Sequence, residues 1–248
     1  MRLFLHQLKA EQRIFWRNRE SAVFIFIFPV MLFLLLGAVY SGTHEGRPVT
    51  DYLVTGLLTY GAANTAFAGL AISLVIRRES GLLKRIRSTP LPPSVYLGAA
   101  LASILAVFTL QSAVLVGLGR ALYGAALPVQ PLALVAALAA GALAFAAMGI
   151  GISGVIRSSE GASAVVNVLV LPMAFLSGAF GPTRNLPEAL QAVADLLPLR
   201  HLVEVVEAVY LTGEGLGGEA ASLAVLAAWG AAGLALAVRR FRWEPRER

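Results

Sequence analysis

Residues 22–40 read AVFIFIFPVMLFLLLGAVY, a run of 19 residues without a charge. All of them except Pro29 and Gly37 are apolar, and about 20 apolar residues are enough for a helix to cross the hydrocarbon core of a bilayer. Their strongly apolar side chains together contribute roughly −6 kcal/mol to insertion, before the cost of the helix ends. The run is longer than the apolar region of a typical signal peptide, and no A-x-A-like cleavage site follows it. The sequence therefore predicts a retained membrane span.

The rest of the chain has the same character. Of its 248 residues, 58% are hydrophobic and 14% are charged, whereas a soluble domain carries about 25% charged residues. This composition excludes a soluble globule, and it excludes a disordered chain because such chains are rich in charge. The chain has no cysteine, which excludes disulfides, thiolate catalysis and cysteine-based metal sites.

Five further charge-free runs are long enough to cross a bilayer as helices. Pro128 and Pro131 interrupt the longest apolar stretch and predict a loop between the third and fourth spans. We therefore expect an all-α membrane protein in which residues 1–248 form a single transmembrane domain. The six expected spans are 22–40, 52–76, 95–118, 132–156, 161–180 and 220–238.

The distribution of Lys and Arg predicts the orientation. If both termini are cytoplasmic, the inner segments hold 16 of the 20 basic residues. This bias follows the positive-inside rule, so we expect a multi-pass protein of the cytoplasmic (inner) membrane with both termini inside. The excess of positive charge then indicates contact with anionic lipid and not nucleic-acid binding.

Residues 1–20 are too polar to insert into a membrane, and their pattern predicts an amphipathic helix on its surface. Leu5, Leu8 and Phe15 lie on one side of this helix, and the basic side chains lie on another. The alternative is a basic segment that only fixes the topology. The residues expected at the membrane surface are Arg2, Lys9, Arg13, Trp16 and Arg17.

The loop after the second span, residues 77–93, combines many cations with a small apolar patch. Leu82, Leu83 and Ile86 form this patch, and the prolines that follow end any helix. A short amphipathic helix that docks a cytoplasmic partner explains the apolar residues, and a solvated loop is the alternative.

The segment between the fifth and sixth spans, residues 181–219, predicts two short amphipathic helices. Charges at Asp195, Arg200 and Glu204 make them too polar to span a membrane. We expect them to re-enter or cap the outer leaflet, with their ends buried in protein.

Catalytic motifs are missing from the sequence. The two lysines, Lys9 and Lys84, do not follow a Gly-x-x-x-x-Gly, so there is no P-loop for ATP hydrolysis. The Gly-x-Ser-Gly around Ser153 resembles the motif of rhomboid proteases, but no histidine lies within an expected span to serve as a base. Small residues that allow close helix approach explain the motif better. The chain is predicted not to be an enzyme and to carry no cofactor or metal.

The expected spans contain no charged residue, whereas proton- or ion-coupled carriers normally keep Asp, Glu, Lys or Arg in the membrane. This argues against a self-sufficient channel or secondary carrier and favours an external source of energy. Polar side chains remain at Asn64, Thr65, Gln111 and Asn167. They form hydrogen bonds between helices, worth about 0.6 kcal/mol on average, or they line a translocation path.

Three stretches resemble the ABC-2 type permeases, which are the membrane subunits of ABC exporters. They are residues 78–92 (RESGLLKRIRSTPLP), 175–187 (FLSGAFGPTRNLP) and 197–201 (LPLRH). Their order and the layout of six spans match this family over nearly the whole chain. Glu207 departs from it, because Arg or Gln usually stands there.

The resemblance implies a coupling helix after the second span, seated in a groove of a separate cytoplasmic ATPase. It implies two copies of that ATPase, which bind ATP and Mg, and two permease subunits, most simply a homodimer, around one substrate path. Position alone makes the short loop at Arg157 and Glu160 a second contact. The coupling role is carried onto Glu79, Leu83, Lys84, Arg85 and Arg87.

The resemblance is strongest to daunorubicin-type exporters of drugs or lipids, and polysaccharide or glycolipid exporters are the alternative. An interior without charge favours a hydrophobic or amphipathic substrate, which the permease would move outward by alternating access.

Overall fold

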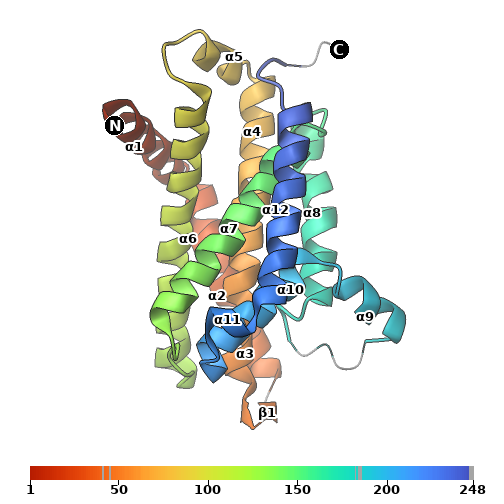
Figure 1. Cartoon of the computed structure of the whole chain (residues 1–248). Coiled ribbons are helices and arrows are strands. Elements are labelled where there is room, and N and C mark those ends of the chain that lie inside the picture. Colours follow the sequence, from red (N-terminus) through yellow and green to blue (C-terminus); the bar gives the residue numbers. More distant parts are fainter. Residues whose placement is uncertain (41, 45, 182, 184–185, 246–248) are drawn as a thin grey trace.

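The computed structural model describes residues 1–40, 42–44, 46–181, 183 and 186–245. Six long apolar helices run along one direction and form a bundle (Figure 1). Each is long and apolar enough to cross a membrane, and each overlaps one of the six expected spans, which are thereby confirmed as helices of the required length. Pro182, in the second of the three motifs, lies outside the described residues.

The bundle is built from α2, α6, α7, α8, α12 and one continuous helix made of α3, η1 and α4. Short elements occupy its two ends. The first half of the chain forms α1 (Arg2–Arg17), α2 (Arg19–Val39), β1 (Thr43–His44), β2 (Arg47–Pro48), α3 (Val49–Ala62), η1 (Ala63–Gly69), α4 (Leu70–Glu79), α5 (Leu82–Arg87) and α6 (Pro93–Tyr123). The second half forms α7 (Pro131–Ser153), α8 (Ser159–Leu176), α9 (Glu188–Ala194), α10 (Pro198–Glu207), η2 (Ala208–Thr212), α11 (Gly215–Gly218) and α12 (Ala220–Arg240).

Some helices begin or end at other residues than expected. A helix is longer than expected where it includes buried polar residues, and a glycine follows the end of another. The second spanning helix begins at Val49 and ends at Glu79, so it includes the buried side chains of Asp51 and Arg78, which the expected range 52–76 left out. The third ends at Tyr123, and Gly124, which adopts a left-handed conformation with φ +65°, follows it. Helix α7 begins at Pro131, one residue before the expected start. The fifth helix ends at Leu176, earlier than predicted.

Small residues bring α7 and α12 into close contact. A Cβ atom on Gly233 would lie 2.5 Å from the backbone nitrogen of Met148, and one on Gly230 would lie 3.2 Å from the Cα of Ala144. Contact at this distance requires small side chains. A Cβ on Gly151, in the motif around Ser153, would lie 2.5 Å from the Gly233 carbonyl oxygen, which confirms the packing interpretation of that motif. A similar approach joins α7 to the π-helical turn η1, where a Cβ on Gly149 would lie 2.6 Å from the Phe67 carbonyl oxygen.

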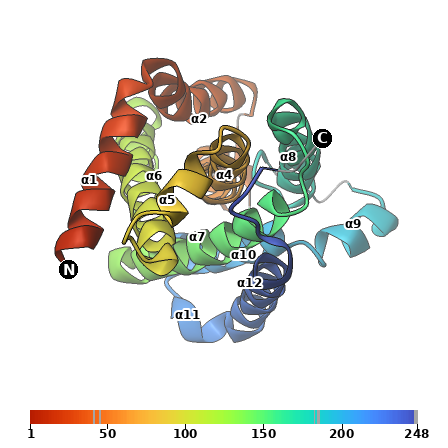
Figure 2. The ribbon, with the colours of Figure 1, turned by 90° about the horizontal axis from the view of Figure 1, so that it is seen from above.

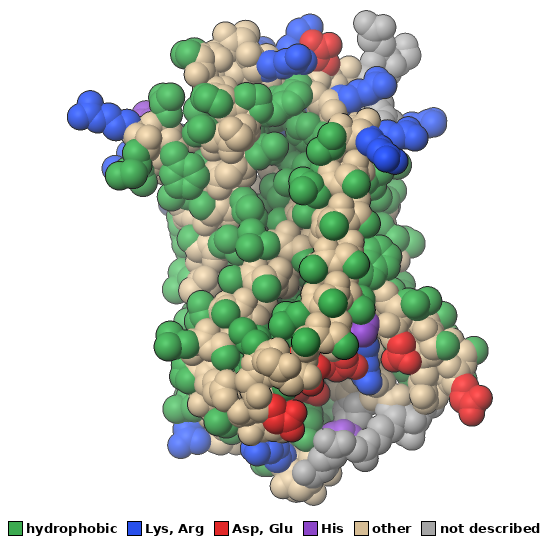
Figure 3. Space-filling view, viewed as in Figure 1, with side chains coloured by type: hydrophobic (Ala, Val, Ile, Leu, Met, Phe, Trp, Pro, Cys, Tyr) green, Lys and Arg blue, Asp and Glu red, His purple; other side chains and the backbone are tan. Residues whose placement is uncertain are grey.

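The two ends of the bundle differ in charge. On the face shown in Figure 3, Lys and Arg gather at the end that carries α5, acidic side chains gather toward the opposite end, and the band between them is free of charge. The latter end contains α9 and α10, the two helices expected between the fifth and sixth spans. Leu199, Leu202 and Val206 of α10 are fully buried, so this helix is part of the core.

Helix α1 lies outside the bundle, alongside α6 and across the direction of the spans (Figures 1 and 2). Seen from above, α2 and α8 flank α4 on two sides (Figure 2).

Candidate functional site

The α4–α5 hairpin at the basic end of the bundle carries most of the predicted partner-binding residues. Helix α4 ends at Glu79, and Gly81 then turns the chain with φ +73°, a conformation that favours glycine. Helix α5 follows directly, and Pro93 begins α6 at its first turn. The Thr89 hydroxyl donates to the Ile86 carbonyl oxygen at 2.6 Å and closes the end of α5. The part of the hairpin that follows the turn is therefore a short helix with a defined beginning and end.

The predicted coupling residues divide between the surface and the interior of this hairpin. Lys84, Arg85 and Arg87 are exposed and form a group of cations that a partner can reach. Leu83, which was assigned the coupling role together with these cations, is fully buried. Its side chain packs into the core of the bundle and anchors α5 there. The Glu79 carboxylate accepts from Arg78 Nε at 2.8 Å and is thus engaged within the chain.

Arg78 connects the hairpin to the second loop at this end. Its side chain is 2% exposed, and its two terminal nitrogens donate to the carbonyl oxygens of Ser153 and Ile156, each at 2.7 Å. Ser153 is the last residue of α7, where backbone oxygens lack helical partners, and Ile156 lies three residues beyond it. Arg78 thus caps α7 and fixes α4 against the segment that leads to Arg157.

The second predicted contact, the loop of residues 157–160, lies beyond this cap. Arg157 and Glu160 are both exposed. Ser158 begins α8, and its hydroxyl accepts a hydrogen bond from the Gly161 N–H at 3.2 Å. Arg78 therefore brings the two predicted contact regions together through the carbonyl of Ile156, which directly precedes the loop.

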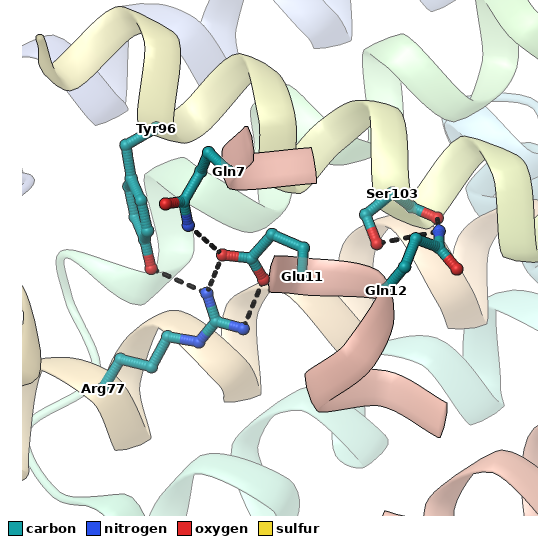
Figure 4. Close-up of polar contacts among 6 residues, drawn as sticks. All are labelled: Gln7, Glu11, Gln12, Arg77, Tyr96 and Ser103. Carbon is teal, nitrogen blue, oxygen red and sulfur yellow. Dashed lines mark hydrogen bonds and ion pairs between the residues drawn. The ribbon is translucent and has the colours of Figure 1, made fainter. Parts of the chain in front are cut away.

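Arg77 faces the other way and binds α1 (Figure 4). It donates twice to the Glu11 carboxylate, at 2.9 Å and 2.6 Å, and once to the Tyr96 hydroxyl oxygen at 2.7 Å. Gln7 donates to the same carboxylate at 2.8 Å. Glu11 is only 5% exposed, so this network is a buried ion pair with its hydrogen-bonding capacity largely used.

A second polar contact fixes α1 further along α6. The Gln12 amide nitrogen lies 3.0 Å from both the carbonyl oxygen and the hydroxyl oxygen of Ser103 (Figure 4). The side of α1 that packs on the protein is thus partly polar, which differs from the expected division into an apolar and a basic face. The residues predicted for the membrane surface, Arg2, Lys9, Arg13, Trp16 and Arg17, are all exposed.

Sequence reasoning missed the partners of these two arginines. It assigned Arg77 and Arg78 to a cytoplasmic loop and gave Glu11 no role. Two signals were present. Glu11 is the lone acidic residue among the first 19 residues, and the two arginines continue the helical register of the span before them.

The four polar residues predicted within the spans do not form one site. The Thr65 hydroxyl donates to the Gln111 amide oxygen at 3.2 Å, and both side chains are buried between η1 and α6. Asn64 is half-buried, and Asn167 is exposed on α8. Thr65 and Gln111 thus form a contact between helices, while Asn167 points away from this subunit.

Polar groups at the opposite end join the outer helices to the spans. The Ala126 N–H donates to the Asp51 carboxylate at 2.9 Å, and the Tyr210 hydroxyl donates to the Ala126 carbonyl oxygen at 2.8 Å. Burial, together with the nearby charge of Asp51, raises the pKa of Tyr210 to about 12. Among the described residues, no group of three or more His, Asp or Glu side chains could hold a metal ion.

Comparison of the sequence with known proteins identifies a matching protein family and a similar protein. The model of the family described as ABC-2 type transporter matches residues 2–211. The "Putative transport permease YvfS" of Bacillus subtilis (strain 168) is 26% identical over 203 residues, which are 81% of this chain and 82% of that protein.

Proposed function

This chain belongs to the ABC-2 type transporter family, and from that premise we propose that it is the permease subunit of an ATP-driven exporter. Two copies of a cytoplasmic ATPase would bind ATP and Mg, and two permease subunits would enclose the substrate path. The observation that carries this proposal is the α5 hairpin, whose three exposed cations stand on a base fixed by buried hydrogen bonds.

The orientation follows from the charge distribution. The end of the bundle that carries α5 is rich in Lys and Arg (Figure 3), and such an end faces the cytoplasm in multi-pass proteins. Both termini of the chain are then cytoplasmic and the hairpin is accessible to an ATPase. Helices α9 and α10 face outward, where they cap the outer leaflet.

The ATPase contact consists of the α5 cations and the neighbouring loop at Arg157 and Glu160. Lys84, Arg85 and Arg87 are complementary to an acidic groove on the partner, and complementary charge sets the orientation of docking. When ATP closes the two ATPase subunits, α5 moves with them. The bonds from Arg78 to the end of α7 carry this displacement into the bundle. ATP binding can shift the permease between inward- and outward-open states because the ATPase engages the two states with different affinity.

The second permease subunit, in our proposal another copy of this chain, contacts the face that contains α8. Asn167 is exposed on this helix within a span. Its amide would lose hydrogen bonds in lipid, so a second subunit or the substrate path is the better neighbour. The six expected ranges contain no charged residue, which suits a hydrophobic or amphipathic substrate, such as a drug or a lipid.

The test is co-purification of the permease with the ABC ATPase encoded beside it. Reversing two cations in Lys84→Glu/Arg85→Glu should abolish co-purification and ATP-driven transport. The matched control is Arg239→Glu/Arg240→Glu, which reverses two exposed cations at the same end of the bundle but on α12. An ATPase that stays bound to the α5 variant with unchanged turnover contradicts the coupling role.

The orientation has a separate test. The chain has no cysteine, so Arg85→Cys introduces a single thiol on the hairpin. An impermeant maleimide should label this thiol in inside-out vesicles and not in intact cells. Labelling in intact cells would place the hairpin outside and remove the basis of the proposal.

A further inference from the structure

Helix α1 presents its cations on the side opposite its contact with the protein. At 100° per residue, Lys9, Arg13 and Arg17 project away from Glu11, which is buried against α4 and α6. Glu11 is the only acidic residue in α1. The exposed face of the helix is therefore positively charged along its whole length, and no acidic side chain of α1 neutralises it.

The position of α1 suits a membrane surface. The helix lies across the direction of the spans, toward the end of the bundle that carries α5 (Figures 1 and 2). Trp16 is 47% exposed on the flank of the basic face, and Leu5 is 48% exposed on the same flank. Tryptophan is enriched at the boundary between lipid and water, and basic side chains beside it are within reach of lipid phosphates.

This surface is connected to the base of the coupling hairpin. Arg77, which binds Glu11, stands in the last turn of α4, and α5 begins five residues later. The ion pair is buried, so separating the two side chains would leave both charges without a partner inside the protein. Helix α1 and the end of α4 consequently move together.

We propose that anionic phospholipid headgroups bind the basic face of α1 and that their occupancy is transmitted to the coupling hairpin through the Glu11–Arg77 ion pair. This inference rests on the proposed function, because it assigns a regulator to the hairpin that contacts the ATPase. Headgroups that bind α1 hold it flat on the membrane surface. Because α1 and the end of α4 move together, this binding favours the corresponding position of the hairpin. The charge of the lipid thereby changes the rate of coupled ATP turnover.

The lipid phosphates and the ion pair have separable roles. The basic face recognises the headgroup charge, so its contribution falls as salt screens exposed charges. The buried ion pair is shielded from the solvent and passes the effect on. A change in the basic face should remove both binding and response, whereas a change in the ion pair should remove the response alone.

The experiment uses the permease–ATPase complex reconstituted in vesicles of phosphatidylcholine alone or mixed with phosphatidylglycerol. Contact between α1 and lipid is read from quenching of Trp16 by brominated phosphatidylglycerol, in a background where the other two tryptophans are phenylalanine. Coupled ATP turnover is measured in the same vesicles. For the wild type we expect brominated phosphatidylglycerol to quench Trp16 more strongly than brominated phosphatidylcholine does. We also expect phosphatidylglycerol to change the rate of ATP turnover about five-fold, which is within the usual range of allosteric coupling.

Two kinds of variant separate recognition from transmission. Replacing Arg2, Lys9, Arg13 and Arg17 by Gln should abolish both preferential quenching and the change in turnover. Glu11→Gln should keep the quenching and lose the change in turnover. Arg77→Lys, which keeps the charge but cannot form both bonds to Glu11, should retain a reduced response. The control Arg239→Gln/Arg240→Gln removes cations from α12 and should behave as the wild type.

Three results would overturn the inference. They are equal quenching of Trp16 by both lipids in the wild type, a full response in the variant without the basic face, and a full response in Glu11→Gln or in Arg77→Lys. Transport in pure phosphatidylcholine distinguishes this failure from failure of the proposed function. If ATP-driven transport proceeds there without any effect of phosphatidylglycerol, the lipid inference fails and the exporter function stands. If the ATPase neither binds nor drives transport in either vesicle, the exporter function fails.

Discussion

Replacement of Arg78 should destabilise the protein far more than replacement of an exposed cation on the same hairpin. Arg78 is 2% exposed and donates two hydrogen bonds to backbone carbonyl oxygens. Hydrogen bonds to charged groups contribute about 1.5–3 kcal/mol each, and the partly exposed pair with Glu79 adds less than about 1 kcal/mol. Arg78→Gln should therefore lower the free energy of unfolding by about 4 kcal/mol. For a chain of this length that corresponds to a decrease in Tm of about 10 °C.

The assay is thermal unfolding in detergent, followed by far-UV circular dichroism. Arg78→Lys keeps the charge but reaches at most one of the two carbonyls, so about half of the loss is expected. Arg87→Gln removes an exposed cation from the same hairpin and should change Tm by no more than about 2 °C, because such side chains contribute little. If Arg78→Gln and Arg87→Gln unfold at the same temperature, Arg78 does not cap α7.

Three further predictions concern packing and pH. Gly233→Ala should lower the free energy of unfolding by about 1–3 kcal/mol, because the new Cβ would lie 2.5 Å from the backbone of α7. Gly117→Ala should not lower it, because the new Cβ there would face open space. Equal Tm values for the two variants would refute the close packing. The raised pKa of Tyr210 means that the folded state retains its proton after the unfolded chain has lost it, so the contribution of Tyr210 to stability is complete below pH 10 and is lost as the pH rises toward 12. Tyr210→Phe should remove this dependence between pH 10 and 12 in alkaline unfolding curves, and an unchanged slope would contradict it. Thr65→Val should lower stability by only about 0.6 kcal/mol, and a double-mutant cycle with Gln111→Leu that gave no coupling would show that the two side chains act independently.

The sequence predicts the spans well because membrane insertion depends on local composition. Six charge-free runs are enough to identify six helices, and Pro131 marks the start of one of them. The bounds are less accurate where a polar residue is buried by tertiary contacts. Asp51 and Arg78 belong to the second spanning helix because backbone groups of distant segments bind their side chains, and periodicity carries no information about such partners.

The sequence predicts which segment forms the candidate site, but it does not predict how the side chains of that segment are arranged. The cations around Leu82 predict a surface for a partner, and Lys84 and Arg85 are exposed, as such a surface requires. The burial of Leu83 could not be predicted, because a leucine in an amphipathic helix can face either a partner or its own core. The role of Glu11 depends on how α1 crosses α6, and this crossing is set by contacts between residues more than 60 positions apart.

The adjacent arginines explain how α5 can be exposed and still be fixed. Neighbouring residues on a helix project about 100° apart, so Arg77 reaches α1 and α6 while Arg78 reaches the end of α7. Apolar side chains of similar volume could fill the same space with comparable stability, but they lack directional bonds. The guanidinium groups fix the end of α4 relative to α1 and α7, because a shift of this end would break their hydrogen bonds. A force applied to α5 must therefore move α1, α4 and the end of α7 as one unit, or break two buried sets of bonds.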